Sequence, residues 1–232
     1  MALVPETPHR GADDPRPAGM PYDAVILAGG RAERLGGLDK PGALVGGRSL
    51  LERVASSVAD ARVLVVVGPP RDAAGAEGSP LARAVVTREE PPGGGPVPAL
   101  CAGLVHVSAP WVALLAADLP FLTAAHVSAL LRAAHDDMHD DAAAAPRTAS
   151  GAVLVDDGGR EQWLTGVWRT AALTGALSGY TGGSLHRLLG PLDPVLVRLP
   201  ASGDGRAPWF DCDTMDDLGA ARARAGEAGP DR

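Results

Sequence analysis

The stretch DAVILAGGRAERLGGLDK, residues 23–40, joins an apolar strand to a glycine-rich loop. Its first half is an apolar run that contains β-branched residues and ends in glycine, which is typical of a buried strand. The next apolar segment, SLLERVASSVA at residues 49–59, has its apolar residues at helical spacing, with Ser49 as a candidate N-cap. Together they predict a strand–loop–helix unit at the start of an α/β domain.

Apolar runs and helical patterns alternate along the rest of the chain. RVLVVVGPP, from residue 62, is typical of a second buried strand, and PPGGGP at residues 91–96 interrupts any regular element. Further strands are predicted at residues 84–87, 111–118, 151–155, 164–168 and 194–199, and further helices at 97–108, after 123, at 170–178, at 184–189 and from 215. This alternation predicts an α/β fold with a single doubly wound, mostly parallel sheet and helices on both faces, a Rossmann-like arrangement.

The length of 232 residues suits one such domain. Residues 1–21 are rich in proline and charge and poor in apolar side chains, so we expect a disordered N-terminal arm. The domain is then expected at residues 22–224, with a loose tail at 225–232.

Charge and cysteine content limit the possible partners. The formal net charge is -7, and no basic face is visible, which argues against nucleic-acid binding. The apolar runs are strand-sized and too short to cross a bilayer, so no membrane partner is expected. The two cysteines have no paired spacing, which favours a reduced, cytoplasmic compartment. Cys101 lies in an apolar helical pattern and Cys212 in an apparent strand, so burial is expected for both thiols.

The loop at residues 27–40 combines backbone freedom with positive charge. Glycine lets backbone N–H groups approach an anion, and cations beside it can neutralise a triphosphate. The alternative is an ordinary glycine-rich turn with solvated charges, which accounts less well for four glycines and three cations after a buried strand. The amino-acid sequence of this loop matches neither the P-loop motif nor the dinucleotide-binding fingerprint. The loop residues concerned are Gly29, Gly30, Gly36, Gly37, Arg31, Arg34 and Lys40.

Asp118 ends the apolar run WVALLAAD, at the edge where open α/β sheets bind their ligands. Beside a triphosphate loop, a carboxylate in this place predicts a Mg²⁺ ligand; the alternative is a helix cap or a partner for a nearby cation. Mg²⁺ takes one or two carboxylates together with phosphates and water. Asp213 is the candidate second ligand and Asp211 a less favoured one. Both acids could instead simply end a strand and cap the helix at 215.

The motifs together resemble those of the molybdenum cofactor guanylyltransferases, within the larger nucleotidyltransferase family. LAGG, RLGG and DK carry the resemblance, which continues through EEPPGGGP at 89–96, LLAADLPFL at 114–122 and FDCDTMDDL at 210–218. The resemblance implies a nucleotidyltransferase fold, Mg²⁺ as cofactor, and GMP transfer from GTP to molybdopterin that carries molybdenum, with release of pyrophosphate. A recipient molybdoenzyme or its chaperone would be a further partner.

The resemblance also implies roles for individual residues. It matches Leu27, Ala28, Gly29, Lys40, Gly68 and Glu90 to nucleotide-binding positions and Asp118 to the acid that holds Mg²⁺. Together with the residue chemistry above, this makes Lys40, Asp118 and Arg34 the expected catalytic residues and Asp118 and Asp213 the expected metal ligands. The expected nucleotide-binding residues are Leu27, Ala28, Gly29, Gly30, Arg31, Gly36, Gly37, Lys40, Gly68, Glu90 and Gly95. Several positions depart from the family: Gly68 stands where members often have a base-contacting Asn, Glu90 where they have Asp, Ala99 where they have Gly, and Met215 where they have Pro.

Three alternatives remain open from the sequence. Asp213 resembles the corresponding segment of molybdenum cofactor cytidylyltransferases, whereas the LAGG spelling favours guanine. A sugar-phosphate nucleotidyltransferase would share the loop and Asp118 but normally has a longer C-terminal region. A protein that carries the cofactor without catalysis would tolerate the changes at Glu90, Ala99 and Met215. Trp163 and Trp168 lie on or near one predicted strand; Trp168 is expected in the core, and Trp163 could stack on a pterin.

Overall fold

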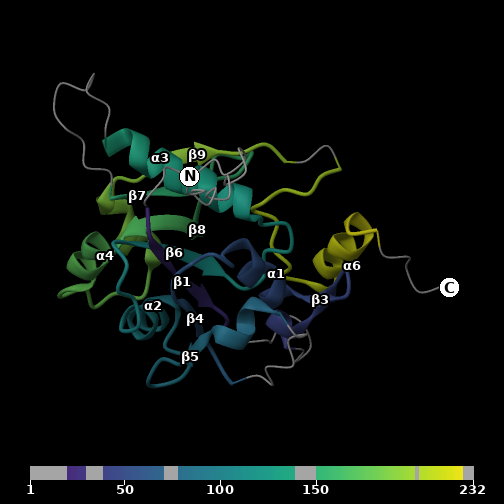
Figure 1. The fold of residues 1–232 in the computed structure, drawn as a ribbon, viewed down its shortest axis with the longest axis horizontal. Coiled ribbons are helices and arrows are strands. Elements are labelled where there is room, and N and C mark those ends of the chain that lie inside the picture. The colour runs from purple at the N-terminus through teal and green to yellow at the C-terminus, as the bar shows by residue number, and fades with distance from the viewer. Residues whose placement is uncertain (1–19, 30–38, 71–77, 139–149, 202–203, 227–232) are drawn as a thin grey trace, which may run out of the picture.

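The computed structural model describes residues 20–29, 39–70, 78–138, 150–201 and 204–226. Among them, seven strands form one sheet in the order β5-β4-β1-β6-β8-β7-β9 (Figure 1). Neighbouring strands are parallel except where β8 pairs with β6 and with β7. The bounds are β1 Tyr22–Leu27, β4 Leu64–Val67, β5 Val85–Thr87, β6 Trp111–Ala116, β7 Gly151–Val155, β8 Glu161–Arg169 and β9 Val195–Arg198. The prediction of a mostly parallel α/β sheet is confirmed.

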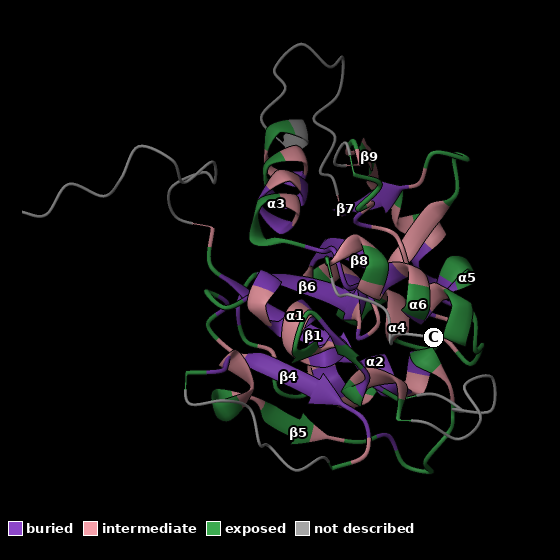
Figure 2. Ribbon diagram, turned by 90° about the vertical axis from the view of Figure 1, so that its right-hand side faces the viewer, coloured by how far each residue is buried: buried purple, intermediate pink, exposed green. Residues whose placement is uncertain are grey.

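Helices cover both faces of this sheet because its central strands are apolar on both sides. In β1, Ala24 and Ile26 belong to one apolar cluster and Val25 and Leu27 to the other. Helices α1 (Leu50–Ser57) and α3 (Ala124–Met138) contribute to the first cluster; α2 (Pro96–Leu104), α4 (Thr170–Leu177) and α5 (Leu185–Leu189) contribute to the second. Figure 2 shows β4 and β6 as buried, whereas β5 at the sheet edge is exposed.

Local sequence signals account for the helix ends. The side chain of Ser49 accepts a hydrogen bond from the Glu52 amide, as expected for the N-cap of α1. Helix α6 (Met215–Arg224) starts with a capping box in which Thr214 and Asp217 bond each other's backbone amides. The strand and helix predictions therefore agree with the structure to within a few residues.

The sequence did not predict a two-stranded antiparallel hairpin between the glycine loop and α1. Its strands, β2 (Leu44–Val45) and β3 (Arg48–Ser49), are too short to show an alternating pattern. The turn uses Gly46 and Gly47, both at positive φ (62° and 72°), which glycine adopts without the steric cost of a Cβ. The short 3₁₀ helix η2 (Lys40–Gly42) leads into this hairpin.

The expected burial of both cysteines is half wrong. Cys212 is buried, although it lies outside any strand, and Cys101 is exposed. Helix α2, which carries Cys101, is apolar around most of its circumference, so the sequence pattern does not distinguish its inner face from its outer one.

The regular elements span the expected domain, since β1 begins at Tyr22 and α6 ends at Arg224. The arm at 1–21 and the tail at 225–232 stay predictions, because residues 1–19 and 227–232 lie outside the described residues. In the described part of the chain, no helix is both long enough and apolar enough to cross a membrane.

Candidate active site

Lys40 lies between two carboxylates that come from distant parts of the chain. Its Nζ atom is 2.5 Å from Asp118 Oδ2 and 2.6 Å from Asp213 Oδ1. Asp118 follows the carboxyl end of β6, Lys40 opens η2, and Asp213 directly precedes the N-cap of α6. The structure thus brings together three of the residues that the sequence singled out.

Main-chain contacts bring the two acid-bearing segments together. The backbone N–H of Cys212 donates to the carbonyl oxygen of Asp118 at 3.2 Å. The Cys212 side chain lies in a small apolar cluster with Val45, Phe121 and Leu218. Burial first, and then the charge of Asp118, raise the pKa of the Cys212 thiol to about 12. The thiol therefore stays protonated and serves as an apolar anchor for the segment that carries Asp213.

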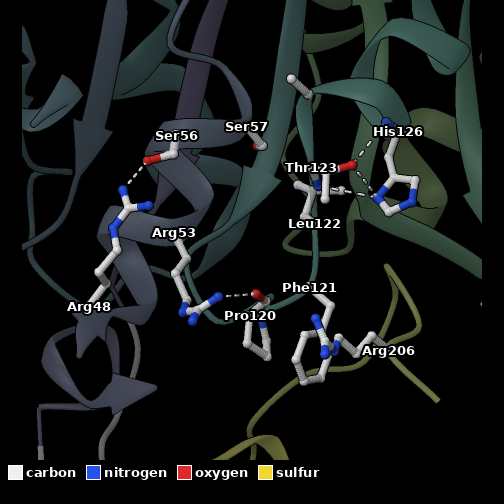
Figure 3. A pocket seen from close by; sticks show the side chains of 11 residues that line it. Arg48, Arg53, Ser56, Ser57, Pro120, Phe121, Leu122, Thr123, His126 and Arg206 are labelled. Carbon is white, nitrogen blue, oxygen red and sulfur yellow. Dashed lines mark hydrogen bonds between the residues drawn. The ribbon is translucent and has the colours of Figure 1, made fainter. Parts of the chain in front are cut away.

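Two arginines tie the hairpin to the same segments. Arg53 on α1 donates to the carbonyl oxygens of Val45 (2.6 Å) and Pro120 (3.2 Å), the second contact being visible in Figure 3. Arg222 on α6 donates to the carbonyl oxygen of Leu44 at 2.9 Å. The hairpin that follows Lys40 is therefore linked to the loop after Asp118 and to the helix after Asp213.

One cavity, of about 450 Å³, lies between α1 and the segment that leads into α3 (Figure 3). Arg48, Arg53 and Arg206 line it. Arg48, in β3, is 3.4 Å from Glu52 on α1, and Arg206 is 2.8 Å from Asp204. Two of its three arginines thus have carboxylate partners close by, which is the usual environment of structural surface arginines.

The electrostatics at Lys40 leave negative charge in excess. Burial by itself lowers the pKa of Lys40, but the charges and hydrogen bonds of Asp118 and Asp213 outweigh it and raise the pKa above the ordinary value. Partial desolvation and the negative charges of Asp213 and Asp118 raise the pKa of nearby Asp211. The Lys40 ammonium therefore lies near three carboxyl groups, those of Asp118, Asp211 and Asp213.

The carboxylate of Asp118 also has an unused oxygen. Its Oδ1 atom is buried and has no hydrogen-bond partner in the described part of the chain. A buried carboxylate oxygen without a partner is costly unless a cation or another donor reaches it. No group of three or more His, Cys, Asp or Glu that could hold a metal occurs among the described residues. Asp118 and Asp213 instead match the one or two carboxylates with which proteins hold Mg²⁺ on a phosphate ligand.

A cavity of about 550 Å³ opens beside Asp118 at the carboxyl ends of the parallel strands. Its volume is in the range of small-molecule sites. Strands β1, β4, β5 and β6, the N-terminal end of α2, and Leu164 of β8 surround it. The lining residues are Leu27, Gly29, Gly68, Pro69, Arg88, Glu89, Pro92, Gly93, Gly95, Pro96, Ala99, Ala116, Asp118 and Leu164.

Five predicted site residues line this cavity: Leu27, Gly29, Gly68, Gly95 and Asp118. Ala28 is not in the lining; it is buried, and its N–H donates to the carbonyl oxygen of Val67. The predicted residues Gly30, Arg31, Arg34, Gly36 and Gly37 lie outside the described residues.

Glu90 does not face the cavity, contrary to its assignment from the sequence. It is exposed and absent from the lining, whereas Glu89 is buried and lines it. Glu89 Oε1 accepts a hydrogen bond from the Gly93 amide at 2.9 Å and so fixes the glycine-rich turn. Two adjacent acids in extended chain face opposite ways, and the pair EE by itself does not reveal which one faces inward.

Trp163 does not extend into this cavity either. Its ring stacks on Trp168 with centroids 6.3 Å apart and meets His186 edge-on at 5.5 Å. The register of β8 against β7 shifts after Val153, which pairs with Gly166, while Leu154 pairs with Gln162. With this irregularity, Trp163 is partly buried and packs against the apolar cluster on the α5 side of the sheet. Within the described residues, the ring for which stacking on a pterin was considered stacks on the buried Trp168.

Gly68 is a glycine for a steric reason. A Cβ atom at this position would lie 2.7 Å from the carbonyl oxygen of Ala28 and 2.8 Å from its carbonyl carbon. Both are backbone atoms at the start of the glycine loop, so they cannot move aside as a side chain would. Strand β4 therefore approaches the end of β1 closely and gives the cavity a wall without side chains at Gly68.

Gly68→Ala is expected to destabilise the fold by about 1–3 kcal/mol, the usual cost of overpacking. It should also weaken nucleotide binding, because the backbone that must shift is the start of the glycine-rich loop that the sequence predicts to bind phosphates. Urea unfolding and titration with nucleotide measure the two effects. Gly219→Ala on α6 is the control: its Cβ would meet nothing within 4 Å, and an alanine inside a helix is expected to stabilise slightly. Equal stability of the two variants would contradict the steric account.

Comparison with known proteins agrees with this geometry. The family model of the MobA-like NTP transferase domain matches residues 24–195. A probable molybdenum cofactor guanylyltransferase of Natronomonas pharaonis is 32% identical over 86% of this chain and 96% of its own length. A molybdenum cofactor guanylyltransferase of Acidiphilium cryptum is 29% identical over 89% of this chain and 97% of its own length.

A solved structure has the same fold. Molybdopterin-guanine dinucleotide biosynthesis protein A of Archaeoglobus fulgidus superimposes with a TM-score of 0.63 over 88% of this chain and 98% of that one, at 18% sequence identity. The family match covers most of the domain, from β1 to the start of β9. The alignment with the Natronomonas relative includes nearly the whole length of that relative. The chain therefore belongs to the MobA-like NTP transferase family and is a nucleotidyltransferase.

Proposed function

We propose that this nucleotidyltransferase transfers GMP from GTP to the terminal phosphate of molybdopterin that carries molybdenum. The product is the guanine dinucleotide cofactor, and pyrophosphate is released. The observation that carries the proposal is the Lys40 ammonium held between Asp118 and Asp213 at a nucleotide-sized cavity. The names of the relatives from Natronomonas and Acidiphilium support the choice of base and acceptor.

The proposed chemistry needs no covalent intermediate. An oxygen of the acceptor phosphate forms a bond to the α-phosphorus, and the bond from that phosphorus to the bridging oxygen breaks, with its electron pair leaving on pyrophosphate. A phosphate is already anionic near neutral pH, so no side chain has to remove a proton from it. The protein's part is to position the reactants and to neutralise their charge.

Each residue of the site has its own proposed role in this reaction. Gly29 lines the cavity just after the end of β1, where a backbone amide can face a phosphate. Lys40 supplies a compact positive charge for the triphosphate oxygens. Asp118 and Asp213 would hold Mg²⁺, which when bound neutralises charge that develops on the phosphate oxygens. The buried, unpartnered Oδ1 of Asp118 supports this assignment.

The setting of the reaction is part of the proposal. We expect the protein to work in the cytoplasm and to pass the finished cofactor to a molybdoenzyme or its chaperone. Neither nucleic acid nor a membrane is an expected partner of a chain with a formal net charge of -7.

GTP with Mg²⁺ is expected to raise the melting temperature more than CTP, ATP or UTP does. A ligand at a hundred times its Kd stabilises the native state by about 2.7 kcal/mol, or roughly 5–10 °C for a domain of this size. Thermal unfolding with each nucleotide measures this. A larger shift with CTP would instead favour a cytidylyltransferase.

Turnover separates the enzyme from a carrier of the cofactor. With GTP, Mg²⁺ and molybdenum-bearing molybdopterin, the protein is expected to release pyrophosphate in proportion to the dinucleotide formed. Nucleotide binding without pyrophosphate release under these conditions would contradict the proposed transfer.

A further inference from the structure

The cavity beside Asp118 offers a bound nucleotide few polar side chains. Of the described residues that line it, only Arg88, Glu89 and Asp118 are polar; the others are glycine, proline or apolar. Asp118 is paired with Lys40, and Glu89 bonds the Gly93 amide. Both carboxylates thus already have partners within the protein.

Arg88 differs from these two acids. Its side chain is exposed, and its guanidinium makes no hydrogen bond or ion pair within the described part of the chain. Arg88 directly follows β5, so it lies at the same carboxyl edge of the sheet as Asp118. It is therefore a cation that lines the cavity and has its donors available to a ligand.

The strand order determines which part of a nucleotide Arg88 meets. The phosphates belong at the ends of β1 and β6, near Gly29 and Asp118, while β5 is the edge strand beyond β4. Three strand spacings separate β6 from β5, roughly 14 Å in all. A nucleotide that lies along this edge with its phosphates at β1 and β6 extends its base past β4 toward β5 and Arg88.

Strand β4 lies between β1 and β5, and Gly68, which directly follows β4, has no side chain that could contact the base. A side chain at that position would collide with the backbone of Ala28. Recognition of a base edge by a side chain at this end of the cavity therefore falls to the residues that follow β5.

We propose that Arg88 determines base specificity by donating two hydrogen bonds to O6 and N7 of guanine. A guanidinium has only donors, arranged as a planar fork, and guanine presents two adjacent acceptors on that edge. On the corresponding edge, adenine has an amino group in place of O6 and cytosine has a donor amino group, so neither presents two adjacent acceptors there. The inference rests on the proposed function, in which GTP occupies this cavity.

An analogue of GTP tests the contact directly. In 7-deaza-GTP a carbon replaces N7, so one of the two acceptors is lost while the triphosphate is unchanged. Calorimetric titration of the full chain with Mg²⁺ is expected to give a Kd about tenfold higher for 7-deaza-GTP than for GTP, the cost of one hydrogen bond to a charged group.

Three variants complete the test. Arg88→Met is expected to weaken GTP binding about five- to a hundredfold and to make GTP and 7-deaza-GTP bind equally. Arg88→Lys keeps the charge but not the fork, so it should also lose most of the difference between the two nucleotides. Arg132→Met, at an exposed position of α3, changes the net charge by the same amount and should bind both like the wild type. Melting temperatures without nucleotide check that each variant folds.

The outcomes separate this inference from the proposed function. A wild-type protein that prefers GTP over CTP, but whose ratio of GTP to 7-deaza-GTP affinity survives in Arg88→Met, would overturn the role of Arg88 alone. Equal weakening of all nucleotides in Arg88→Met would also overturn it, because that pattern belongs to a phosphate contact. A wild-type protein that binds CTP more tightly than GTP would overturn both.

Discussion

Asp118→Asn is expected to lower kcat by about 10²- to 10³-fold with little change in melting temperature. The substitution keeps the shape of the side chain but removes the charge that faces Lys40 and would hold Mg²⁺. A bound metal contributes several kcal/mol, roughly, to transition-state charge stabilisation, and about 1.4 kcal/mol corresponds to tenfold in rate. The residual activity should need much more Mg²⁺ for half-saturation. Initial rates over a Mg²⁺ series measure both effects.

Asp216→Asn is the matched control for that experiment. Asp216 lies in the first turn of α6, close in sequence to Asp213, but its side chain is exposed. Its activity and Mg²⁺ dependence should stay at wild-type values. One outcome would contradict the assignment of Asp118 as a metal ligand. In that outcome Asp118→Asn lowers the melting temperature but leaves the Mg²⁺ dependence of the remaining activity unchanged.

Lys40→Ala is expected to weaken GTP binding and to lower turnover, each about ten- to a hundredfold. Charge-assisted hydrogen bonds of this kind contribute about 1.5–3 kcal/mol. The loss also leaves Asp118 and Asp213 facing the triphosphate without the ammonium between them. Titration with GTP and steady-state rates measure the two effects, and Arg48→Ala, in strand β3, serves as control.

The choice of lysine can be tested in the same series. Lys40 is the only lysine in a sequence whose other basic side chains are arginines and histidines. Both carboxylates approach one nitrogen atom closely, which suits a compact ammonium better than a planar guanidinium. Lys40→Arg should therefore recover little of the lost activity. Full recovery in Lys40→Arg would mean that a positive charge near Asp118 suffices, whatever its geometry.

The unique lysine also allows a measurement that does not depend on turnover. An amine-acylating reagent should modify Lys40 and the N-terminal amine alone among the side chains and termini of this chain. GTP with Mg²⁺ is expected to protect Lys40 but not the N-terminus, which mass spectrometry can distinguish. Equal protection of both amines would argue against a contact between Lys40 and the nucleotide.

Much of the fold could be predicted because its signals are local. The six residues of β1 are all buried, and a continuous apolar run of this length suits a strand covered on both faces. Ser49 and Thr214 stand where helix N-caps are needed, and both cap as their residue type favours. The spelling LAGG and the acid after β6 then identified the family and the sheet edge that carries the cavity.

Errors arose where one residue's neighbours, rather than its type, decide its direction. Trp163 and Trp168 are five positions apart, so a regular strand would turn their rings to opposite faces; the irregular pairing of β8 brings both to one. Glu89 rather than Glu90 turns inward because the chain there is held by the Gly93 amide. Cys101 is exposed because α2 presents another part of its apolar surface to β1 and β4.

By itself, the sequence determined the strands of the main sheet, the helix starts, the family and the presence of Lys40, Asp118 and Asp213 as candidate site residues. Those properties depend on residue type and on spacing within a few positions. Only the tertiary structure decided that Lys40 lies between the two carboxylates, because that arrangement depends on long-range contacts. The Cys212 amide donates to the Asp118 carbonyl oxygen, and Arg53 and Arg222 donate to carbonyl oxygens of the hairpin. It also decided that Arg88 lies at the far end of the cavity, since the order of the strands in the sheet depends on which strand edges pair and not on order along the chain.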